Sequence, residues 1–330
     1  MTHAKDQGPK VDVLLQSNWA EAGLVQDVRR GLGSQPRTLP PKWLYDEAGS
    51  RLFDQITRLP EYYPTECERT VLRDAAADIA AASRATTVIE LGSGTSDKTR
   101  LLLDAFADAG RLERFVPVDV SEETLRDAAD MLAARYPGTS VEAVVGDFTL
   151  HLGHLARYQH KLVAFLGGTI GNLYVEERAA FLGALADSMD EGDELLLGTD
   201  LVKDADRLIT AYDDPGGVTE AFVKNSLRVL NRQLGADFDV DAFSYVPFWD
   251  RRMQRMDLRL RAEMPQHVTV PGAGIELDLA SGEEIRVEIS TKFTPARLRD
   301  ELGAAGLEIT RIWTDPTDSF AVTLARKQAQ

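Results

Sequence analysis

A glycine-rich turn, ELGSGTS at residues 90–96, is the strongest chemical signal in this 330-residue sequence. An apolar run, TTVIEL, leads into it and predicts a buried strand, and a helical pattern follows. Glycine lets a backbone turn sharply and approach a ligand closely, as Gly92 and Gly94 would here. The pattern reads G-x-G-x-S, so the third glycine of the dinucleotide fingerprint is missing. Because Glu90 suits a cation better than a pyrophosphate, the turn favours a sulfonium cofactor over NAD; a purely structural turn is the alternative.

Two further strand ends carry side chains that suit an adenosyl group. Asp119 ends the second predicted strand about 25 residues past the glycines, where a carboxylate can accept hydrogen bonds from both ribose hydroxyls. It could instead cap the next helix, a role that Ser121 would fill equally well. Asp147 and Phe148 end the third strand and place an acceptor for the adenine amino group beside an aromatic face. This ordered set predicts S-adenosylmethionine as the cofactor, with S-adenosylhomocysteine as product and no metal.

A second glycine-rich turn, LGGTIGNL at residues 166–173, follows the fourth predicted strand. It would lie at the same edge of the sheet, where methyltransferases hold the methyl acceptor. The Asn-Pro-Pro-Tyr type of motif used by many enzymes that methylate amides and nucleobases is absent. Gly167, Thr169 and Asn172 can instead hold a small zwitterion through carbonyl, hydroxyl and amide groups.

Composition narrows the choice of partners. The formal net charge of −16 argues against nucleic acid, because binding to a polyanion depends on Lys and Arg. Apolar residues are interleaved in the arginine-rich stretch 251–261, and the alternation from Met256 to Arg261 predicts a strand with one wet face rather than a binding patch. No apolar run could span a membrane and the N-terminus is polar, so we expect a cytoplasmic protein. A metal role for His151 and His154 is a weaker interpretation than a polar surface turn.

Short apolar runs alternate with helical patterns through the middle of the chain, which is typical of a doubly wound parallel sheet. A helical stretch, an aromatic-rich segment and strand-like runs follow, and then a helix and two apolar runs that suit an antiparallel hairpin at the sheet edge. The predicted strands of the sheet are 86–91, 114–120, 140–145, 161–166, 194–199, 307–313 and 320–324. The predicted helices are 98–107, 122–135, 176–188, 204–234 and 295–304.

The fold class that follows is α/β, a Rossmann-like class I methyltransferase sheet with a second, substrate-binding lid domain. Residues 1–62 and 201–292 would form the lid beside the carboxyl edge of the sheet, where ligands of α/β proteins bind. Residues 63–200 would form the cofactor-binding domain, and residues 293–330 would close it.

Six stretches of the sequence resemble the histidine-specific Nα-methyltransferases of ergothioneine biosynthesis. Enzymes of this family use S-adenosylmethionine to convert L-histidine into its trimethylbetaine, hercynine. The resemblance spans about residues 29–324, and LPEYYPTE and GTIGN are specific to this family and its close relatives. The stretches are PPKWLYD, LFDQITRLPEYYPTE, ELGSGTSDKT, FLGGTIGNL, LLLGTDLVKD and EISTKF.

The resemblance implies a role for each matching residue. Asn172 and Tyr212 would hold the substrate carboxylate, whereas Glu288 and Ser290 would bind the imidazole, helped by Tyr62 through water. The groups around the α-amino nitrogen would be Tyr45, Phe53, Gly167 and Thr169. The cofactor would contact Gly92, Lys98, Asp119, Asp147 and Phe148.

Residue chemistry supports the imidazole assignment independently. A carboxylate and a hydroxyl two residues apart on one strand face, Glu288 and Ser290, can pair with both ring nitrogens. An indole or phenyl ring would leave these groups unpaired, at a cost of about 1–3 kcal/mol. The alternative is that Glu288 faces solvent and Ser290 merely ends a strand. Two positions depart from the family pattern: Gly168 lies where serine is common, and Leu258 lies where a methionine lines the substrate side.

Three other functions stay open at this point. The chain could methylate another small amino acid such as tryptophan, act as an NAD-dependent oxidoreductase, or bind a ligand without catalysis. The expected partner is free L-histidine, and we expect a monomer with no membrane or nucleic-acid partner.

Overall fold

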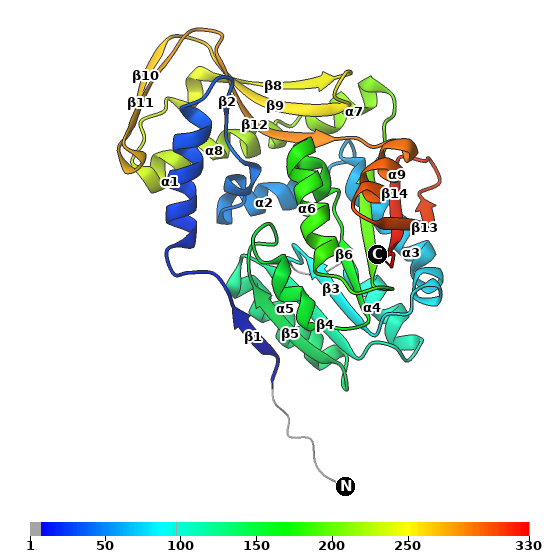
Figure 1. The fold of residues 1–330 in the computed structure, drawn as a ribbon. Coiled ribbons are helices and arrows are strands. Elements are labelled where there is room, and N and C mark those ends of the chain that lie inside the picture. The colour runs from blue at the N-terminus through cyan, green and yellow to red at the C-terminus, as the bar shows by residue number, and fades with distance from the viewer. Residues whose placement is uncertain (1–7, 95, 97, 330) are drawn as a thin grey trace.

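An eight-stranded sheet runs through the lower half of the molecule (Figure 1). The computed structural model describes residues 8–94, 96 and 98–329, so Thr95 and Asp97 of the first glycine motif lie outside the described part. The strand order is β1-β5-β4-β3-β6-β7-β14-β13, parallel except for β14 and β13. The strands are β1 (Lys10–Val13), β3 (Thr87–Leu91), β4 (Arg114–Asp119), β5 (Ser140–Val145), β6 (Lys161–Phe165), β7 (Glu194–Asp200), β13 (Leu307–Thr314) and β14 (Phe320–Lys327).

Helices cover both faces of this sheet, which confirms the predicted doubly wound arrangement. Successive strand residues enter opposite cores, as Val88 and Ile89 show. The antiparallel pair β13 and β14 is the predicted hairpin. The first face packs against α3 (Tyr63–Ala82), α4 (Thr99–Asp108) and α5 (Glu122–Arg135), and the second against α6 (Val175–Asp187), α9 (Pro295–Ala304) and the 3-10 helix η2 (Leu152–Arg157).

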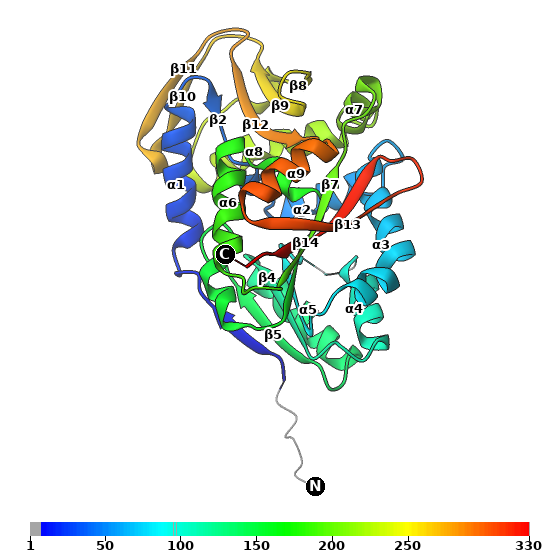
Figure 2. The same cartoon turned by 45° about the vertical axis from the view of Figure 1, so that its right-hand side comes forward.

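A smaller four-stranded sheet, in the order β2-β12-β9-β8, lies above the large one in both ribbon views (Figures 1 and 2). One hydrophobic core joins residues 24–63 to residues 208–287, so the two segments fold together. The elements here are β2 (Arg37–Thr38), β8 (Phe243–Asp250), β9 (Arg255–Ala262), β10 (Gln266–Val270), β11 (Ile275–Leu279), β12 (Glu284–Thr291), α1 (Trp19–Leu32), α2 (Glu47–Ile56), α7 (Ala205–Tyr212), α8 (Val218–Leu234), η1 (Pro41–Leu44), η4 (Val240–Ala242) and η5 (Pro271–Ala273).

Two features differ from the sequence expectation. The predicted helix 204–234 is wrong as one element, because α7 ends at Tyr212 and α8 begins at Val218. Pro215 and Gly217 both lie in the break between α7 and α8, and Gly217 adopts a left-handed φ of 68°. Strand β1 was not expected, and it pairs with β5, so segment 1–62 contributes a strand to each sheet. The alternation around residues 256–261 is confirmed as strand β9.

Candidate active site

Two glycine turns meet at the centre of the large sheet. Strands β3 and β6 are neighbours, and the helices that follow them, α4 and α6, pack on opposite faces. A doubly wound sheet binds ligands at such a switch point, outside the carboxyl ends of its strands. Gly92 and Gly94 after β3 have φ of 68° and 48°, and Gly167 and Gly168 after β6 have φ of 79° and 68°. Glycine adopts this left-handed region without strain, so Gly168 suits the backbone of this turn.

Two carboxylates, Asp119 and Glu90, brace the first turn. Asp119 accepts a hydrogen bond from the backbone N–H of Gly94 at 2.9 Å. Glu90 is buried and accepts hydrogen bonds from the hydroxyls of Ser96, at 2.8 Å, and Thr99. Burial raises the pKa of Glu90 to about 7, and the two hydroxyls oppose this rise. Glu90 therefore fixes the turn to α4, and its contact with the cofactor stays a prediction.

Polar groups at this turn fit an adenosyl ligand. The hydroxyl of Ser93 is buried and has no hydrogen-bond partner within the described residues, so a bound ligand could satisfy it. Asp119 also accepts from the backbone N–H of Ser121 at 3.0 Å, while the Ser121 side chain makes no capping bond to α5. Asp119 thus orders both the turn and the start of α5, and its contact with the ribose stays a prediction.

Asp147 and Phe148 follow β5 at the same edge. Asp147 is buried and accepts hydrogen bonds from the backbone N–H and the hydroxyl of Thr149, at 2.8 and 2.6 Å. Phe148 packs edge-on against Phe165, with ring centroids 5.2 Å apart. A Cβ on Gly92 would lie 3.7 Å from the Phe148 ring, so this ring borders the glycine turn. The structure therefore gathers the predicted cofactor residues along three adjacent strand ends.

A buried carboxylate on α3 links the two glycine turns. Glu68 is fully buried, forms an ion pair with Lys98 beside the first turn, and accepts from the backbone N–H of Gly167 at 2.6 Å. Sequence reasoning missed this residue, although it lies two positions after the quoted LPEYYPTE motif. Its contacts place the predicted cofactor residue Lys98 next to the turn predicted to hold the substrate.

The second turn delivers Asn172 to the smaller sheet. The 3-10 helix η3 (Thr169–Asn172) packs so closely on β12 that a Cβ on Gly171 would lie 2.7 Å from the carbonyl oxygen of Thr291. This approach lets the Asn172 amide donate to Glu288 Oε1 at 2.9 Å. Leu258 is buried on β9 directly opposite Glu288, so it borders the same carboxylate. Glu288 therefore faces the site rather than solvent.

Ser290 lies in a buried hydrogen-bonded network. The hydroxyl of Tyr212 donates to Ser290 Oγ at 2.8 Å. Lys292 donates to Tyr212 Oη and to Ser290 Oγ, both at 2.8 Å, and forms an ion pair with Asp200 at 2.8 Å. Asn172, Tyr212, Glu288 and Ser290 thus make one polar cluster. Lys292 and Asp200 were not predicted; Lys292 continues the spacing of two from residues 288 and 290, which was the available signal.

Aromatic rings line the cluster. Phe53 packs edge-on against Tyr45 and Tyr62, with centroids 5.3 and 6.3 Å apart, and Phe222 packs against Tyr45 and Phe53 at 5.4 and 5.8 Å. Tyr62 contacts Tyr212 at 5.9 Å. Tyr45 nevertheless exposes 41% of its surface. These five residues, here called the aromatic group, bring the predicted amine-side residues next to the polar cluster, and Phe222 joins them unpredicted.

Glu288 has an unusually high pKa within the polar cluster. Burial raises the pKa of Glu288 to about 7, opposed by the hydrogen bond from Asn172 and the charge of Lys292. Desolvation also raises the pKa of Tyr212 and Tyr62 well above the ordinary phenol value, with nearby carboxylates adding to the rise. The site therefore contains a carboxylate that titrates near neutrality among phenols that keep their protons.

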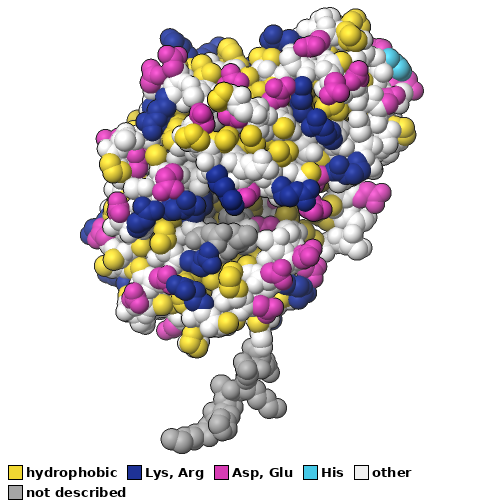
Figure 3. All heavy atoms as spheres, turned by 180° about the vertical axis from the view of Figure 1, so that it is seen from behind, with side chains coloured by type: hydrophobic (Ala, Val, Ile, Leu, Met, Phe, Trp, Pro, Cys, Tyr) yellow, Lys and Arg dark blue, Asp and Glu magenta, His cyan; other side chains and the backbone are white. Residues whose placement is uncertain are grey.

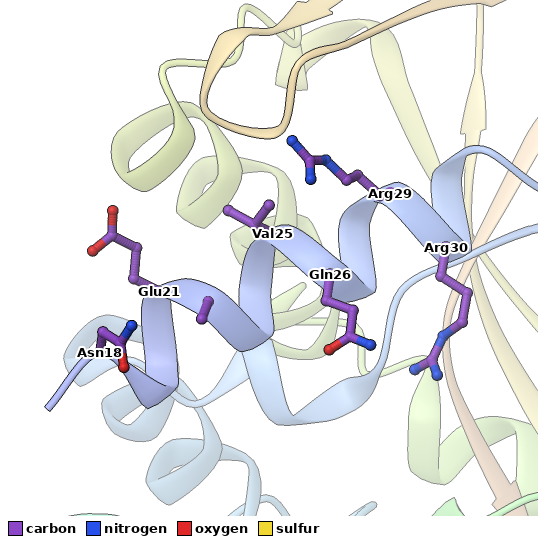
Figure 4. Close-up of a pocket in the computed structure, with 7 residues that line it drawn as sticks. Asn18, Glu21, Val25, Gln26, Arg29 and Arg30 are labelled. Carbon is purple, nitrogen blue, oxygen red and sulfur yellow. The ribbon is translucent and has the colours of Figure 1, made fainter. Parts of the chain in front are cut away.

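Other features of the described chain lie outside the polar cluster and the aromatic group. Within residues 8–94, 96 and 98–329 there is no group of three His, Cys, Asp or Glu placed to hold a metal, and no helix long and apolar enough to cross a membrane. His151 bonds to the Asp147 backbone, and His154 lies beside Asp12. On the reverse face, Lys and Arg interleave with Asp and Glu (Figure 3). An open hollow of about 730 Å³ beside α1 is lined by residues 18–30 only (Figure 4).

Comparison with known proteins places the chain in a family. The family model described as a histidine-specific, SAM-dependent methyltransferase matches residues 24–327. Histidine N-alpha-methyltransferases of Mycolicibacterium smegmatis and Mycobacterium tuberculosis are each 53% identical, over 94% and 92% of this chain and 97% and 95% of those proteins. A solved S-adenosylmethionine-dependent methyltransferase from Clostridium acetobutylicum has a TM-score of 0.45 and 10% identity, over 85% of this chain and 99% of that one. The chain belongs to the histidine-specific, S-adenosylmethionine-dependent methyltransferase family.

Proposed function

We propose that this chain methylates the α-amino nitrogen of L-histidine three times to give hercynine, a step of ergothioneine biosynthesis. The observation that carries this proposal is the pairing of Asn172 with Glu288 and of Tyr212 with Ser290. A small amino acid could reach its carboxylate anchors and its ring anchors in this one cluster. Family membership supports the same activity.

The cofactor, when bound, supplies an electrophilic methyl group on a sulfonium. The residues that would hold it lie at the carboxyl ends of β3, β4 and β5, together with Lys98. Their carboxylates, glycine backbone and the unpaired Ser93 hydroxyl fit an adenosyl group carrying an amino acid tail. They are Glu90, Gly92, Gly94, Lys98, Asp119, Asp147 and Phe148.

On the substrate side, the protein mainly positions the reactants. Holding two reactants in line lowers the part of the activation barrier that comes from lost translational and rotational entropy. Asn172 and Tyr212 would fix the carboxylate, and Glu288 and Ser290 would fix the ring. The α-amino nitrogen would then face the turn that carries Thr169. Each transfer needs a neutral amine, so either Tyr45 or bulk water relayed past Thr169 would receive the ammonium proton.

The aromatic group would surround the amine and its methylated forms. Ring faces attract a cation, so Phe53 would retain a partly methylated ammonium between transfers. Desolvation and the nearby Glu288 carboxylate raise the pKa of Tyr45 well above the ordinary value. Tyr45 would thus act as a neutral phenol beside the amine, with Gly167 leaving room opposite and Tyr62 reaching the ring through water.

A second substrate, such as tryptophan, has weaker support in the site. An indole would leave the Glu288 carboxylate or the Ser290 hydroxyl without a partner, which costs about 1–3 kcal/mol for a buried group. Leu258 offers apolar contact, but it lies opposite Glu288 rather than in place of it. Family membership removes the NAD-dependent oxidoreductase and the non-catalytic binding protein from the alternatives.

The setting of the reaction is also part of the proposal. We propose a cytoplasmic monomer that acts on free histidine, without a metal, nucleic acid or membrane partner. The net charge of −16 supports a small zwitterion over a polyanion. The division into a lid (residues 1–62 and 201–292) and a cofactor-binding part (63–200, closed by 293–330) belongs to the same proposal, with β1 crossing to the large sheet.

Mass spectrometry tests the function directly. The protein, S-adenosylmethionine and L-histidine should yield histidine with one, two and finally three added methyl groups on the α-nitrogen. Tryptophan and other free amino acids, assayed in parallel, should give at most trace product. Methylation of another amino acid in preference to histidine would contradict the proposal.

A further inference from the structure

Arg178, near the start of α6, is a fully buried arginine whose guanidinium joins three elements. It donates twice to the Glu301 carboxylate on α9, from Nε at 2.9 Å and from Nη2 at 2.8 Å. Its Nη1 donates to the carbonyl oxygen of Leu173 at 2.7 Å and to Thr291 Oγ1 at 3.2 Å. One side chain therefore ties the end of the second glycine turn to strand β12 and to helix α9.

The two acceptors of Nη1 are each next in sequence to a predicted substrate residue. Leu173 follows Asn172, the last residue of η3, and Thr291 follows Ser290 in β12. Successive residues of a strand point to opposite faces, so Thr291 reaches Arg178 on the face away from Ser290. Arg178 therefore holds the backbone behind the site and would not touch the ligand.

The predicted substrate residues come from two parts of the chain that this arginine connects. Glu288 and Ser290, here called the ring anchors, share one face of β12, and Tyr212 donates to Ser290 at 2.8 Å. Asn172 comes from η3, and its amide donates to Glu288 at 2.9 Å. An amide has a second N–H, which is left for the substrate carboxylate. The position of η3 against β12 therefore decides whether Asn172 reaches the carboxylate of a ligand whose ring lies on the ring anchors.

Stability alone is a weak reason for a buried ion pair such as Arg178 and Glu301. Taking two charges out of water is costly, and well-packed apolar residues in the same place are often as stable or more stable. An apolar pair would lack direction, however. A guanidinium is a rigid planar fork, so its four hydrogen bonds fix Glu301, Leu173 and Thr291 relative to one another.

We propose that Arg178 is a positioning residue for the substrate carboxylate, because it fixes Asn172 of η3 against the ring anchors of β12. The distance between the Asn172 amide and the ring anchors would then match the distance between the carboxylate and the ring of the substrate. Loss of Arg178 would leave the ring anchors together on one strand but would let η3 move. The carboxylate would then contribute less to binding. This inference deepens the proposed function and rests on it.

Calorimetry with L-histidine and histamine measures the contribution of the carboxylate. Histamine has the same ring and amine but no carboxylate, and S-adenosylhomocysteine in place of the cofactor prevents turnover. At pH 8 the rings of both ligands are neutral, because an imidazole has a pKa near 6.5. Both ligands use the ring anchors, so a change there cancels in the ratio of the histamine to the histidine dissociation constant. In the wild type we expect a ratio of about ten or more, as a hydrogen bond to a charged group provides.

A double variant, Arg178→Met with Glu301→Gln, removes these four bonds without leaving a buried charge alone. We expect histamine affinity to change by less than about threefold, whereas the ratio falls about tenfold. The matched control is Lys161→Met with Asp193→Asn, another buried ion pair, which lies at the opposite, amino end of β6. The control should keep the wild-type ratio.

A double-mutant cycle shows whether Arg178 acts through Asn172. The Arg178 and Glu301 changes together should weaken histidine binding about tenfold in the wild-type background, but less than about threefold when Asn172 is already replaced by alanine. A general loosening of the fold would act on every ligand and in every background. Equal losses in both backgrounds, or equal losses of histamine and histidine affinity, would therefore overturn the inference.

Two changes at Thr291 give a milder test that spares the ion pair. Thr291→Val removes the hydroxyl that accepts from Arg178 but keeps the shape of the side chain, so the ratio should fall about threefold. Thr291→Ser keeps the hydroxyl and should keep the wild-type ratio. The same ratio in both variants would overturn the role of Arg178. Failure of the wild-type protein to bind or methylate histidine would instead remove the proposed function.

Discussion

At the scale of single residues, the site keeps a carboxylate where its charge is poorly tolerated. Burial raises the pKa of Glu288 to about 7, although Asn172 and Lys292 oppose the rise. A carboxyl group with a higher pKa in the folded state than in the unfolded state destabilises the fold when it ionises. The cost is complete above about pH 7, fades as the pH falls towards the unfolded value, and is absent below it. The ionised Glu288 carboxylate therefore lowers the stability of the fold while it provides the hydrogen-bond acceptor that the substrate needs.

Glu288→Gln should separate stability from binding. Glutamine can still accept from Asn172 but carries no charge, so we expect the free energy of unfolding at pH 8 to rise by about 1–2 kcal/mol and by less at pH 5. Histidine affinity should fall at least tenfold, since the charged acceptor is lost, while cofactor affinity stays unchanged. Urea denaturation and calorimetry measure these effects. Equal stability changes at both pH values, or unaltered histidine binding, would contradict the assignment.

Replacing Asp119 should weaken binding of the cofactor rather than binding of histidine. Asp119→Ala removes the predicted ribose acceptor and the bond to the Gly94 N–H, so the dissociation constant of S-adenosylhomocysteine should rise at least tenfold. Histidine affinity should change much less. Ser121→Ala is the control, because Ser121 bonds to Asp119 through its backbone N–H and not through its side chain. A selective loss of histidine affinity in Asp119→Ala would contradict the proposed cofactor site.

At the scale of elements, one tight contact sets the geometry of the substrate side. In Gly171→Ala, the new Cβ would lie 2.7 Å from the Thr291 carbonyl oxygen, so η3 and β12 must separate. We expect a loss of about 1–3 kcal/mol in stability, and weaker histidine binding because Asn172 moves away from Glu288. Gly183→Ala in α6 is the control, since nothing lies within 4 Å of its Cβ. The Gly183→Ala control should raise the free energy of unfolding by up to about 1 kcal/mol and leave histidine binding unchanged.

Elements with a strong local pattern were predictable. Helices α5 and α9 begin and end at the predicted residues, because their apolar periodicity and flanking signals are local. Strand β1 has four residues and gains its order from pairing with β5, which a local pattern does not encode. The break after Tyr212 was missed because helical periodicity continues on both sides, although Pro215 marked it.

The candidate site was predictable only where a motif carried it. Resemblance supplied residues such as Asn172 and Glu288, and the structure brings them together. The buried charges Glu68, Asp200 and Lys292 were not found, because their partners lie far away in sequence: Tyr63 and Asp200 are 137 positions apart. Ion pairs between distant segments depend on the tertiary fold, and single-sequence spacing does not identify the two partners.

At the scale of the whole molecule, one helix ties the two halves to each other. Tyr63 at the start of α3 packs in the core shared by the N-terminal segment and the insertion, whereas Val71 and Ile79 pack in the core of the large sheet. Glu68 lies between these ends and holds both Lys98 and the Gly167 amide. A ligand that orders Lys98 should therefore also order the turn that receives the second ligand.

Glu68→Gln should weaken this coupling between ligands. Glutamine can still accept from the Gly167 N–H but loses the charge that holds Lys98. In the wild type, we expect S-adenosylhomocysteine to raise histidine affinity by about 5-fold or more, at the low end of typical coupling energies. In the variant this factor, measured by calorimetric titration with and without the cofactor product, should approach one.

The matched control for that titration is Glu66→Gln, the same chemical change on the same helix. Glu66 pairs with Arg69 at the surface, where its side chain is 60% exposed, so it reaches neither glycine turn. This control should keep the wild-type factor, because an exposed pair contributes little to either site. By reciprocity, histidine must raise affinity for S-adenosylhomocysteine by the same factor. An undiminished factor in Glu68→Gln would mean that the two halves communicate by a route other than Glu68 and Lys98.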